Sequence, residues 1–302
     1  MVDLCLGTVQ FGMKYGINNK LGQPSLENSF EMLDVAIENG IGVIDTASAY
    51  GDAERILGKY FKSRGNVKKV KIISKLKPNV LEPNKCSYDV INKELETSFH
   101  LLGVDRLNGF LLHTPEYIYR TDVLNALISL KNQKLVENIG VSIYDIEEGW
   151  AAIESGMVDY IQVPYSVLDQ RAVKTGFAKK VKEAGITLFT RSAFLQGLFL
   201  MSPKLIPSYL KEAVPYILIF ENLLDKYKVK KIDALIHFVT IESDIDYLVF
   251  GVDTKEQLIE NINSYHNSTI PSEFVIELKE QIEQIDKSVI FPSLWANGKK
   301  VR

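Results

Sequence analysis

Eight short apolar runs, each followed by a longer segment with helical spacing, set the tightest limit on the fold of this 302-residue chain. The runs lie at residues 4–9, 41–46, 70–76, 107–114, 138–144, 160–166, 186–192 and 247–253. Short β-rich apolar runs that alternate with helical patterns are typical of strand–helix units. Eight such units in series favour a closed parallel (β/α)8 barrel, with a doubly wound open sheet as the alternative. We therefore expect one α/β domain over residues 1–302.

Helix start and stop signals support this alternation. We expect helices within residues 25–40, 87–103, 172–185 and 254–265. Ser25, Ser87 and Thr254 stand where an N-cap residue is expected, because their hydroxyl groups can accept a free backbone N–H. The stretch 194–243 is longer than one unit needs, so it predicts a long connection with two helices after the seventh strand. A C-terminal helix plus a tail is expected to follow the eighth strand.

Composition and charge exclude several function classes. The net charge of −3 argues against the basic surface of a nucleic-acid-binding protein. No apolar run approaches the ~20 residues that span a bilayer, and the N-terminal residues do not resemble a signal peptide. Two cysteines in unlike contexts and four scattered histidines predict neither a disulfide framework nor a metal site. We expect a cytoplasmic protein that acts on a small molecule, and no sequence feature indicates its oligomeric state.

Polar side chains end three successive apolar runs. Asp45 ends the second, Lys75 the third and His113 the fourth, and Tyr50 follows Asp45 closely. Because barrel active sites form at the carboxyl ends of the strands, we expect these four side chains around one mouth. Singly, each has an ordinary explanation: a helix cap, a solvated lysine, a structural histidine and a packing tyrosine. Their joint occurrence at neighbouring strand ends favours a catalytic set.

These residue types suggest proton transfer to a carbonyl oxygen. Asp45 would pair with Lys75, and the ammonium would lower the Tyr50 pKa from its usual value of ~10, which makes Tyr50 a proton donor. His113 would orient the substrate oxygen. Since no side chain supplies hydride, a nicotinamide cofactor is implied. A lyase that forms a Schiff base on Lys75 is an alternative, but pairing with Asp45 opposes the neutral amine that it needs.

Over nearly its whole length the chain resembles the aldo-keto reductases. The motifs that carry the resemblance are LGTVQFG, GIGVIDTASAYGDAERILG, ISKLK, LLHTPE, ENIGVSIYD, QVPYS, RSAFLQGLF and FGVDTKEQLIEN. The resemblance implies a (β/α)8 barrel that binds extended NADP(H) without a Rossmann motif, and the chain has no G-x-G-x-x-G. It also implies that Asp45, Tyr50, Lys75 and His113 form the family's catalytic tetrad, with Tyr50 as the general acid in carbonyl reduction.

The resemblance further implies which residues bind the cofactor. They are Gly7, Thr8, Ser142, Gln162, Arg191, Ser192, Gly251, Gln257 and Asn261. Two positions depart from the family pattern: Ile143 replaces a frequent Asn, and Arg191 replaces an aromatic residue that stacks on the nicotinamide. We expect Arg191 to favour reduction and an anionic or sugar-like substrate. Binding of a cofactor phosphate by Arg191, or a pairing with a neighbouring acid, are the alternatives.

The cofactor and substrate remain broadly defined by the sequence. The resemblance favours NADPH, but the segment expected to grip the 2′-phosphate offers only Lys255, next to Asp253, so NADH is also possible. Tyr117 and Trp295 are candidates to border the substrate pocket. The alternative from another functional class is a regulatory protein on the same barrel, which would bind the cofactor with little turnover.

Overall fold

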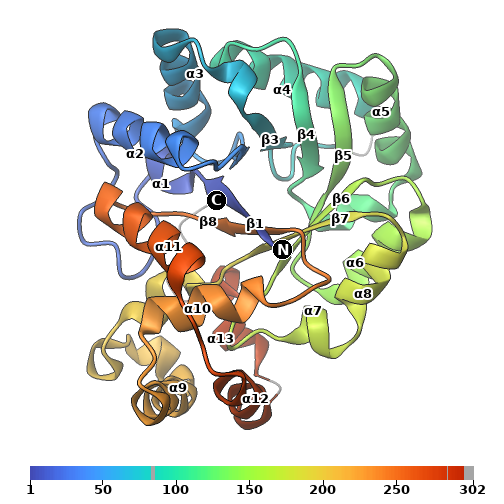
Figure 1. The fold of residues 1–302 in the computed structure, drawn as a ribbon. Coiled ribbons are helices and arrows are strands. Elements are labelled where there is room, and N and C mark those ends of the chain that lie inside the picture. Colours follow the sequence, from blue (N-terminus) through green and yellow to red (C-terminus); the bar gives the residue numbers. More distant parts are fainter. Residues whose placement is uncertain (83–85, 284, 296–302) are drawn as a thin grey trace.

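Eight parallel strands form a closed barrel in this computed structural model, which describes residues 1–82, 86–283 and 285–295. Each strand pairs with the next along the chain, and β8 pairs back with β1. The strands are β1 (Asp3–Gly7), β2 (Val43–Asp45), β3 (Lys71–Lys75), β4 (Leu107–Leu112), β5 (Val136–Ser142), β6 (Tyr160–Pro164), β7 (Thr187–Arg191) and β8 (Tyr247–Phe250). Figure 1 shows the helices outside this ring. The (β/α)8 prediction is confirmed, since an open sheet would leave β1 and β8 unpaired with each other.

The helices follow the strands in the predicted alternation. In chain order they are α1 (Val9–Gly12), α2 (Leu26–Glu38), α3 (Ala53–Arg64), α4 (Ser87–Leu102), α5 (Thr121–Asn132), α6 (Ile146–Ser155), α7 (Arg171–Lys174), α8 (Phe177–Glu183), α9 (Val214–Tyr227), α10 (Lys231–Thr240), α11 (Lys255–Asn267), α12 (Ser272–Gln281) and α13 (Lys287–Ile290). The hydroxyl of Ser25 caps α2 and that of Thr254 caps α11, so both predicted caps are confirmed. Within the described ranges, no helix combines the length and the apolar character needed to cross a membrane.

Two local predictions are wrong. Ser87 is the first residue of α4 and not its cap, because its hydroxyl donates to the carboxylate of Asp122. The helix expected at 172–185 is two helices, α7 and α8. Gly176 separates them with a positive φ of 75°, a conformation that glycine adopts readily and that ends a right-handed helix.

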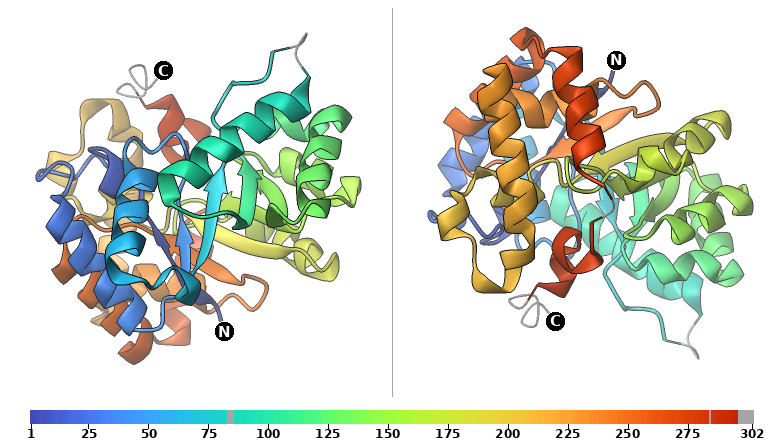
Figure 2. Two further views of the ribbon diagram at one scale, coloured as in Figure 1. Left: turned by 90° about the horizontal axis from the view of Figure 1, so that it is seen from above. Right: turned by 90° about the horizontal axis from the view of Figure 1, so that it is seen from below.

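The long connection after β7 matches its prediction. It contains three short 3₁₀ segments (Leu195–Leu200, Pro203–Leu205 and Ser208–Ala213), then α9 and α10. The C-terminal part has α12 and the additional short helix α13, whereas the predicted tail lies largely outside the described residues. In both views of Figure 2, α13 (red) lies at the opposite end of the barrel from the N-terminus. That end is where the strands finish.

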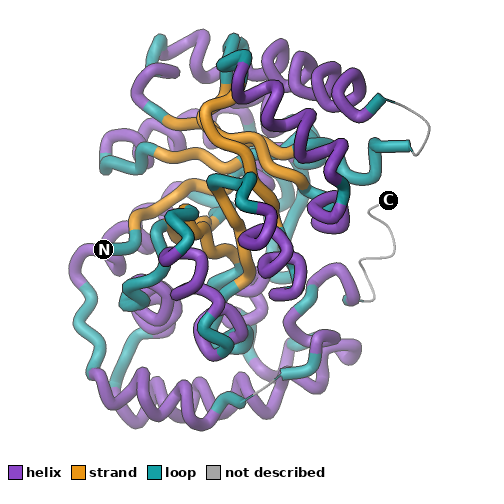
Figure 3. Tube along the Cα trace, turned by 90° about the vertical axis from the view of Figure 1, so that its right-hand side faces the viewer, coloured by secondary structure: helices purple, strands orange, loops and turns teal. Residues whose placement is uncertain are grey.

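The inside of the barrel is layered. One apolar layer is formed by Cys5, Val43, Ile73, Leu111, Phe189 and Val249. Because strand side chains alternate between two faces, the residues two positions further along also point inward, one layer closer to the carboxyl ends. Those residues are Gly7, Asp45, Lys75, His113, Arg191 and Gly251. Figure 3 shows the strands, in orange, enclosed by the helices, so this polar layer can open only at an end of the barrel.

A buried carboxyl group docks α3 against β3, next to this layer. Glu54 is 2% exposed, and the hydroxyl of Ser74 donates to its Oε1 at 2.6 Å. Burial raises the pKa of Glu54 above its usual value. The folded protein therefore holds the proton on Glu54 more tightly than the unfolded chain does.

We predict that Glu54→Gln removes a pH-dependent cost of folding. Since the folded-state pKa of Glu54 is raised, its contribution to stability is present below the unfolded pKa of ~4.5 and is lost as the pH rises through the folded pKa. The free energy of unfolding of the wild type should therefore fall relative to that of Glu54→Gln as the pH rises above about 4.5, as measured by urea denaturation. Glu38→Gln, at an exposed position of α2, is the matched control. A difference that is constant with pH would contradict the prediction.

Candidate active site

A buried ion pair forms the floor of the barrel mouth. Lys75 is fully buried, and its Nζ lies 2.7 Å from both carboxylate oxygens of Asp45. The same Nζ donates to the main-chain oxygen of Thr46 at 3.0 Å and contacts the Tyr50 hydroxyl at 3.3 Å. The structure thus brings Asp45, Lys75 and Tyr50 together. Because the Lys75 amine is held by both oxygens of a buried carboxylate, it is poorly placed to act as a free nucleophile.

Residues from three other strands hold the Asp45 carboxyl group and its backbone. Gln162 on β6 donates from Nε2 to Asp45 Oδ1 at 2.8 Å, and the Ser142 hydroxyl on β5 donates to Gln162 Oε1 at 3.3 Å. The Thr8 hydroxyl, after β1, donates to the main-chain oxygen of Asp45 at 3.0 Å. The sequence predicts these three residues as cofactor ligands; the structure places them in a network that fixes Asp45. Contact with a cofactor stays a prediction.

Two glycines set the position of Tyr50. Gly12 ends α1, and its main-chain oxygen accepts from the Asp52 N–H at 3.2 Å. A Cβ at Gly12 would lie 1.6 Å from the Tyr50 main-chain oxygen, and a Cβ at Gly51 would lie 2.3 Å from the Gly12 oxygen. Only glycine permits this backbone contact, which holds the Tyr50 segment against α1.

The Tyr50 hydroxyl keeps its proton. Burial, and then the negative charge of Asp45, raise the Tyr50 pKa well above 10, although Arg191 acts in the opposite direction. The expected lowering of this pKa is therefore wrong, because the net shift is upward. The physical reason is that burial, and then the negative charge of Asp45, disfavour the phenolate. Tyr50 is a neutral phenol at physiological pH.

His113 stands beside Tyr50 and is also neutral. The two rings meet edge to face, with centroids 5.8 Å apart. Burial, helped by the charges of Lys75 and Arg191, lowers the His113 pKa to about 3. Its Nδ1 is buried, with no hydrogen-bond partner within the described part of the chain. The imidazole thus completes the predicted group of four and retains a nitrogen that a ligand can satisfy.

Arg191 is held in the mouth by neutral groups. Its guanidinium carbon lies 4.6 Å from the centre of the Tyr144 ring. One terminal nitrogen donates to the main-chain oxygen of Ile143 at 2.9 Å, and the other donates to the Ser192 hydroxyl at 3.3 Å. No carboxylate among residues 1–82, 86–283 and 285–295 forms a salt bridge with Arg191. Pairing with a neighbouring acid, one of the alternatives from the sequence, is therefore not observed.

Sequence reasoning missed two tyrosines of this region. Tyr144 stacks on Arg191, and the Tyr15 hydroxyl accepts from Gln196 Nε2 at 3.2 Å. Burial, and then the proximity of Tyr50 and Tyr144, raise the Tyr15 pKa. Tyr144 is the last residue of the fifth predicted run, and Tyr15 lies in the segment that follows the first run. Their position at or after a strand end is the sequence signal that could have identified them.

The other predicted cofactor residues lie on the neighbouring strand ends. Gly7 pairs with Asp45 in the sheet, and Gly251 packs against the Gln10 side chain. Gln257 accepts from the Asp253 N–H at 2.8 Å, and Asn261 is buried in α11. Gly7 ends β1 next to Asp45, Gly251 directly follows β8, and Gln257 and Asn261 lie in α11.

The two predicted substrate residues have structural contacts. The Tyr117 hydroxyl accepts from the Leu81 N–H at 3.0 Å, which fixes the segment after β3. Trp295 is 4% exposed, and its indole N–H donates to the main-chain oxygen of Val289 at 3.1 Å. A substrate contact for either residue stays a prediction.

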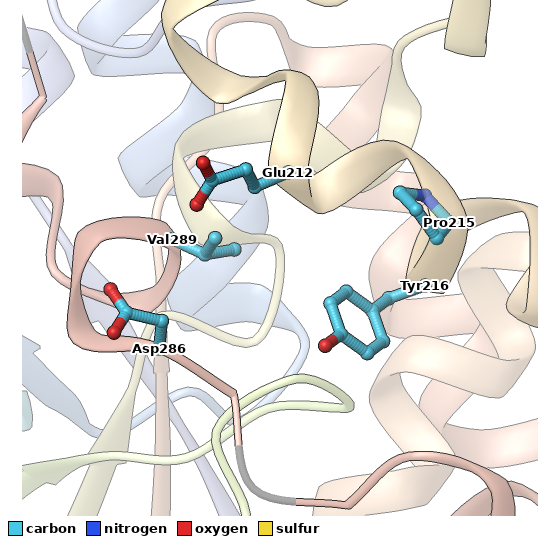
Figure 4. A pocket seen from close by; sticks show the side chains of 5 residues that line it. All are labelled: Glu212, Pro215, Tyr216, Asp286 and Val289. Atoms are coloured by element: carbon cyan, nitrogen blue, oxygen red, sulfur yellow. The ribbon is translucent and has the colours of Figure 1, made fainter.

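A cavity of about 410 Å³ opens elsewhere, between the long connection and the C-terminal segment. Figure 4 shows its lining residues, Glu212, Pro215, Tyr216, Asp286 and Val289. None of the four tetrad candidates lines it, so it is separate from the chemistry around Lys75. Across the described chain, no group of three or more His, Cys, Asp or Glu side chains could hold a metal ion.

Comparisons with known proteins agree with this architecture. Residues 3–283 match the model of the Aldo/keto reductase family. The NADH-specific methylglyoxal reductase of Escherichia coli (strain K12) is 28% identical over 178 residues, covering 53% of this chain and 54% of that protein. Oxidoreductase sirO of Leptosphaeria maculans is 22% identical over 315 residues, covering 91% of this chain and 92% of that protein. The chain spans only about half the length of several curated relatives that it matches.

Solved structures show the same fold. A structure from Pseudomonas aeruginosa that carries the aldo-keto reductase name has a TM-score of 0.65 and 23% sequence identity. The alignment covers 87% of this chain and 88% of that one. At this identity the likeness concerns the fold.

We predict that the His113 imidazole does not titrate near neutrality. Because its pKa is lowered to about 3, its ring proton signals in NMR spectra should stay constant between roughly pH 5 and 8. Arg191→Met removes one of the positive charges that lower this pKa, so it should move the titration to higher pH. A wild-type midpoint near the ordinary ~6.5 would show that His113 is solvated instead.

Proposed function

The chain belongs to the aldo/keto reductase family, and we propose that it reduces an aldehyde or a ketone to an alcohol with NADPH or NADH. One observation carries the proposal: the protonated Tyr50 hydroxyl lies 3.3 Å from Lys75 Nζ and beside a neutral histidine. This arrangement provides a proton donor, a nearby cation and a second hydrogen-bonding group at one point.

The residues at the mouth fit a nicotinamide cofactor. Among the buried polar atoms that have no partner within the described residues, three belong to residues just after strand ends: Gln10 Oε1, Thr46 Oγ1 and His113 Nδ1. Ser142 and Gln162 would hold the nicotinamide amide, whereas residues of β8 and α11 would hold the adenosine end. A bound nicotinamide would supply the hydride that no side chain here can donate.

Tyr50 acts as the general acid in this proposal. It donates its proton to the carbonyl oxygen as the carbonyl carbon receives hydride, and the Lys75 ammonium stabilises the phenolate that remains. Solvent restores the proton before the next turnover. His113, being neutral, donates an N–H to the same oxygen and orients it without giving up its proton. Asp45 acts through Lys75, because its carboxylate holds the Lys75 Nζ next to the Tyr50 hydroxyl.

We predict that Tyr50→Phe lowers kcat by roughly 100- to 10,000-fold, the usual contribution of a general acid. Cofactor affinity, measured by NAD(P)H fluorescence, should change little, because the ring is retained. The assay follows cofactor oxidation with a panel of aldehydes, keto-sugars and keto-acids. Wild-type protein that binds the cofactor but reduces no carbonyl would contradict the proposal and favour the regulatory alternative.

The pH dependence follows from the same two groups. A raised pKa keeps the Tyr50 proton donor present up to high pH, and a lowered pKa keeps His113 neutral down to acidic pH. We predict that kcat for reduction is flat between about pH 5 and 10, because Tyr50 keeps its proton throughout that range and loses it only at higher pH. An inflection near ~6.5 would indicate instead that a solvated histidine controls the rate.

The residues at β8 and α11 favour weak discrimination between the two cofactors. Lys255, the expected 2′-phosphate ligand, lies 3.3 Å from Glu31 in a surface ion pair. Asp253 adds a half-buried carboxylate nearby, which accepts from Asn19 at 3.0 Å. NADPH, the cofactor favoured by the resemblance, would meet a like charge here, and one relative is named as NADH-specific. We propose that the protein accepts both cofactors.

We predict that Asp253→Asn raises the preference for NADPH over NADH by roughly 10-fold, because one negative charge near the 2′-phosphate is removed. The asparagine keeps an oxygen for Asn19. The measurement is the ratio of kcat/KM for the two cofactors. Asp244→Asn, which removes the same charge before β8, should leave that ratio unchanged. If the ratio of kcat/KM for NADPH and NADH is the same in Asp253→Asn and Asp244→Asn, the 2′-phosphate does not bind near Asp253.

A further inference from the structure

We propose that Arg191 binds an oxyanion of the substrate, so that the carbonyl compound reduced here carries a carboxylate or a phosphate group. This inference rests on the proposed carbonyl reduction and names the substrate class for the same site. The observations that carry it are the charge balance of the mouth, the rigid support of the guanidinium and its place in the polar layer.

The mouth contains two arginines with opposite surroundings. Arg171 binds Asp145 at 3.0 Å and Asp169 at 2.8 Å, so its charge is compensated. Arg191 has only the Ile143 carbonyl and the Ser192 hydroxyl as acceptors, within the part of the chain that is described.

The carboxylates near Arg191 are committed to other cations. Asp45 binds Lys75 through both oxygens. Asp145 binds Lys287 at 2.7 Å in addition to Arg171. A half-buried guanidinium without a counter-charge is costly, and an anionic ligand would remove that cost.

Stacked side chains hold the guanidinium in one orientation. Arg191 lies on Tyr144, the Tyr144 ring centre is 5.9 Å from that of Phe291, and Arg171 lies 4.8 Å from the Phe291 centre. We call this series, Arg191–Tyr144–Phe291–Arg171, the aromatic stack. It fixes the plane of the guanidinium, while two hydrogen bonds engage only part of its five N–H donors. The remaining donors form the planar fork that binds carboxylate and phosphate oxygens.

The position of Arg191 links this anion site to the reacting carbonyl. Arg191 ends β7 two residues after Phe189, so it belongs to the same inward layer as Asp45, Lys75 and His113. Its charge is felt at both Tyr50 and His113, the two groups that would meet the carbonyl oxygen. One small molecule can therefore reach Tyr50 with its carbonyl and Arg191 with an anionic group. Short 2-oxo acids and phosphorylated aldoses have this form.

Matched substrate pairs test the inference. Each pair joins an anionic carbonyl compound to a neutral counterpart: pyruvate with pyruvamide, and glyceraldehyde 3-phosphate with glyceraldehyde. In the wild type we expect the anionic member of at least one pair to have the higher kcat/KM. The pair that shows this difference identifies whether the anionic group of the substrate is a carboxylate or a phosphate. Arg191→Met should lower the ratio of anionic to neutral kcat/KM by about 100-fold, the loss typical of a charged hydrogen-bonded pair.

Two further variants separate charge from geometry and from folding. Arg191→Lys keeps the charge without the planar fork, so it should restore part of the ratio. Arg106→Met removes an arginine from an exposed pair with Glu137, ahead of β4, and should not change the ratio. Thermal unfolding of each variant shows whether the fold is retained. If Arg191→Met does not fold, Arg191→Lys provides the test. A ratio of anionic to neutral kcat/KM in Arg191→Lys equal to that of the wild type would contradict the need for the planar guanidinium fork.

A binding measurement keeps this inference separate from the proposed reduction. Oxamate, which is not reduced, and inorganic phosphate are titrated calorimetrically into the protein. Binding of either anion that is lost in Arg191→Met supports the site, even if no carbonyl is turned over and the reductase proposal fails. Failure of both anions to bind, together with equal kcat/KM within each pair, overturns the inference. So does a loss of NADPH affinity in Arg191→Met with an unchanged substrate ratio, because Arg191 would then bind a cofactor phosphate.

Discussion

The buried pair of Lys75 and Asp45 is the interaction on which the rest of the mouth depends. An ion pair without solvent is stable only if its remaining hydrogen-bonding capacity is satisfied. Here the Thr46 carbonyl and the Tyr50 hydroxyl complete the surroundings of the amine, and Gln162 reaches Asp45 from across the barrel. The pair thereby joins β2, β3 and β6, and Tyr50 beside it stays protonated because of its burial and of the Asp45 charge.

Charge is distributed unevenly around that neutral pair. Tyr50 and His113 are both neutral at physiological pH, and Arg171 is matched by two aspartates. Among the described residues, Arg191 is therefore the cation at the barrel mouth that has no carboxylate partner. In a low-dielectric site, such a charge acts strongly on whatever binds beside it. In the proposed reaction, proton transfer and substrate selection would thus fall to different side chains.

The sequence was sufficient to predict the eight strands, their closure and the meeting of Asp45, Tyr50, Lys75 and His113. The reason is geometric: parallel strands that close into a barrel bring their ends together wherever they lie in the chain. Properties that depend on surroundings were not predictable. The Tyr50 pKa is set by burial and by Asp45, Ser87 turns to Asp122, and a single glycine, Gly176, divides a helix whose periodicity looks continuous. The support of Arg191 depends on rings far apart in sequence.

The aromatic stack has a consequence for the order in which the protein matures. Its members come from residues 144–291, and Phe291 belongs to the C-terminal segment that packs on the loops after β5 and β6. During synthesis the barrel strands leave the ribosome well before Phe291 does. The tetrad can therefore assemble on a nascent chain in which the Tyr144 ring, on which Arg191 lies, is not yet packed against Phe291. In the proposed reaction, chemical competence would then precede full selectivity, and docking of the segment after α13 would complete the aromatic stack.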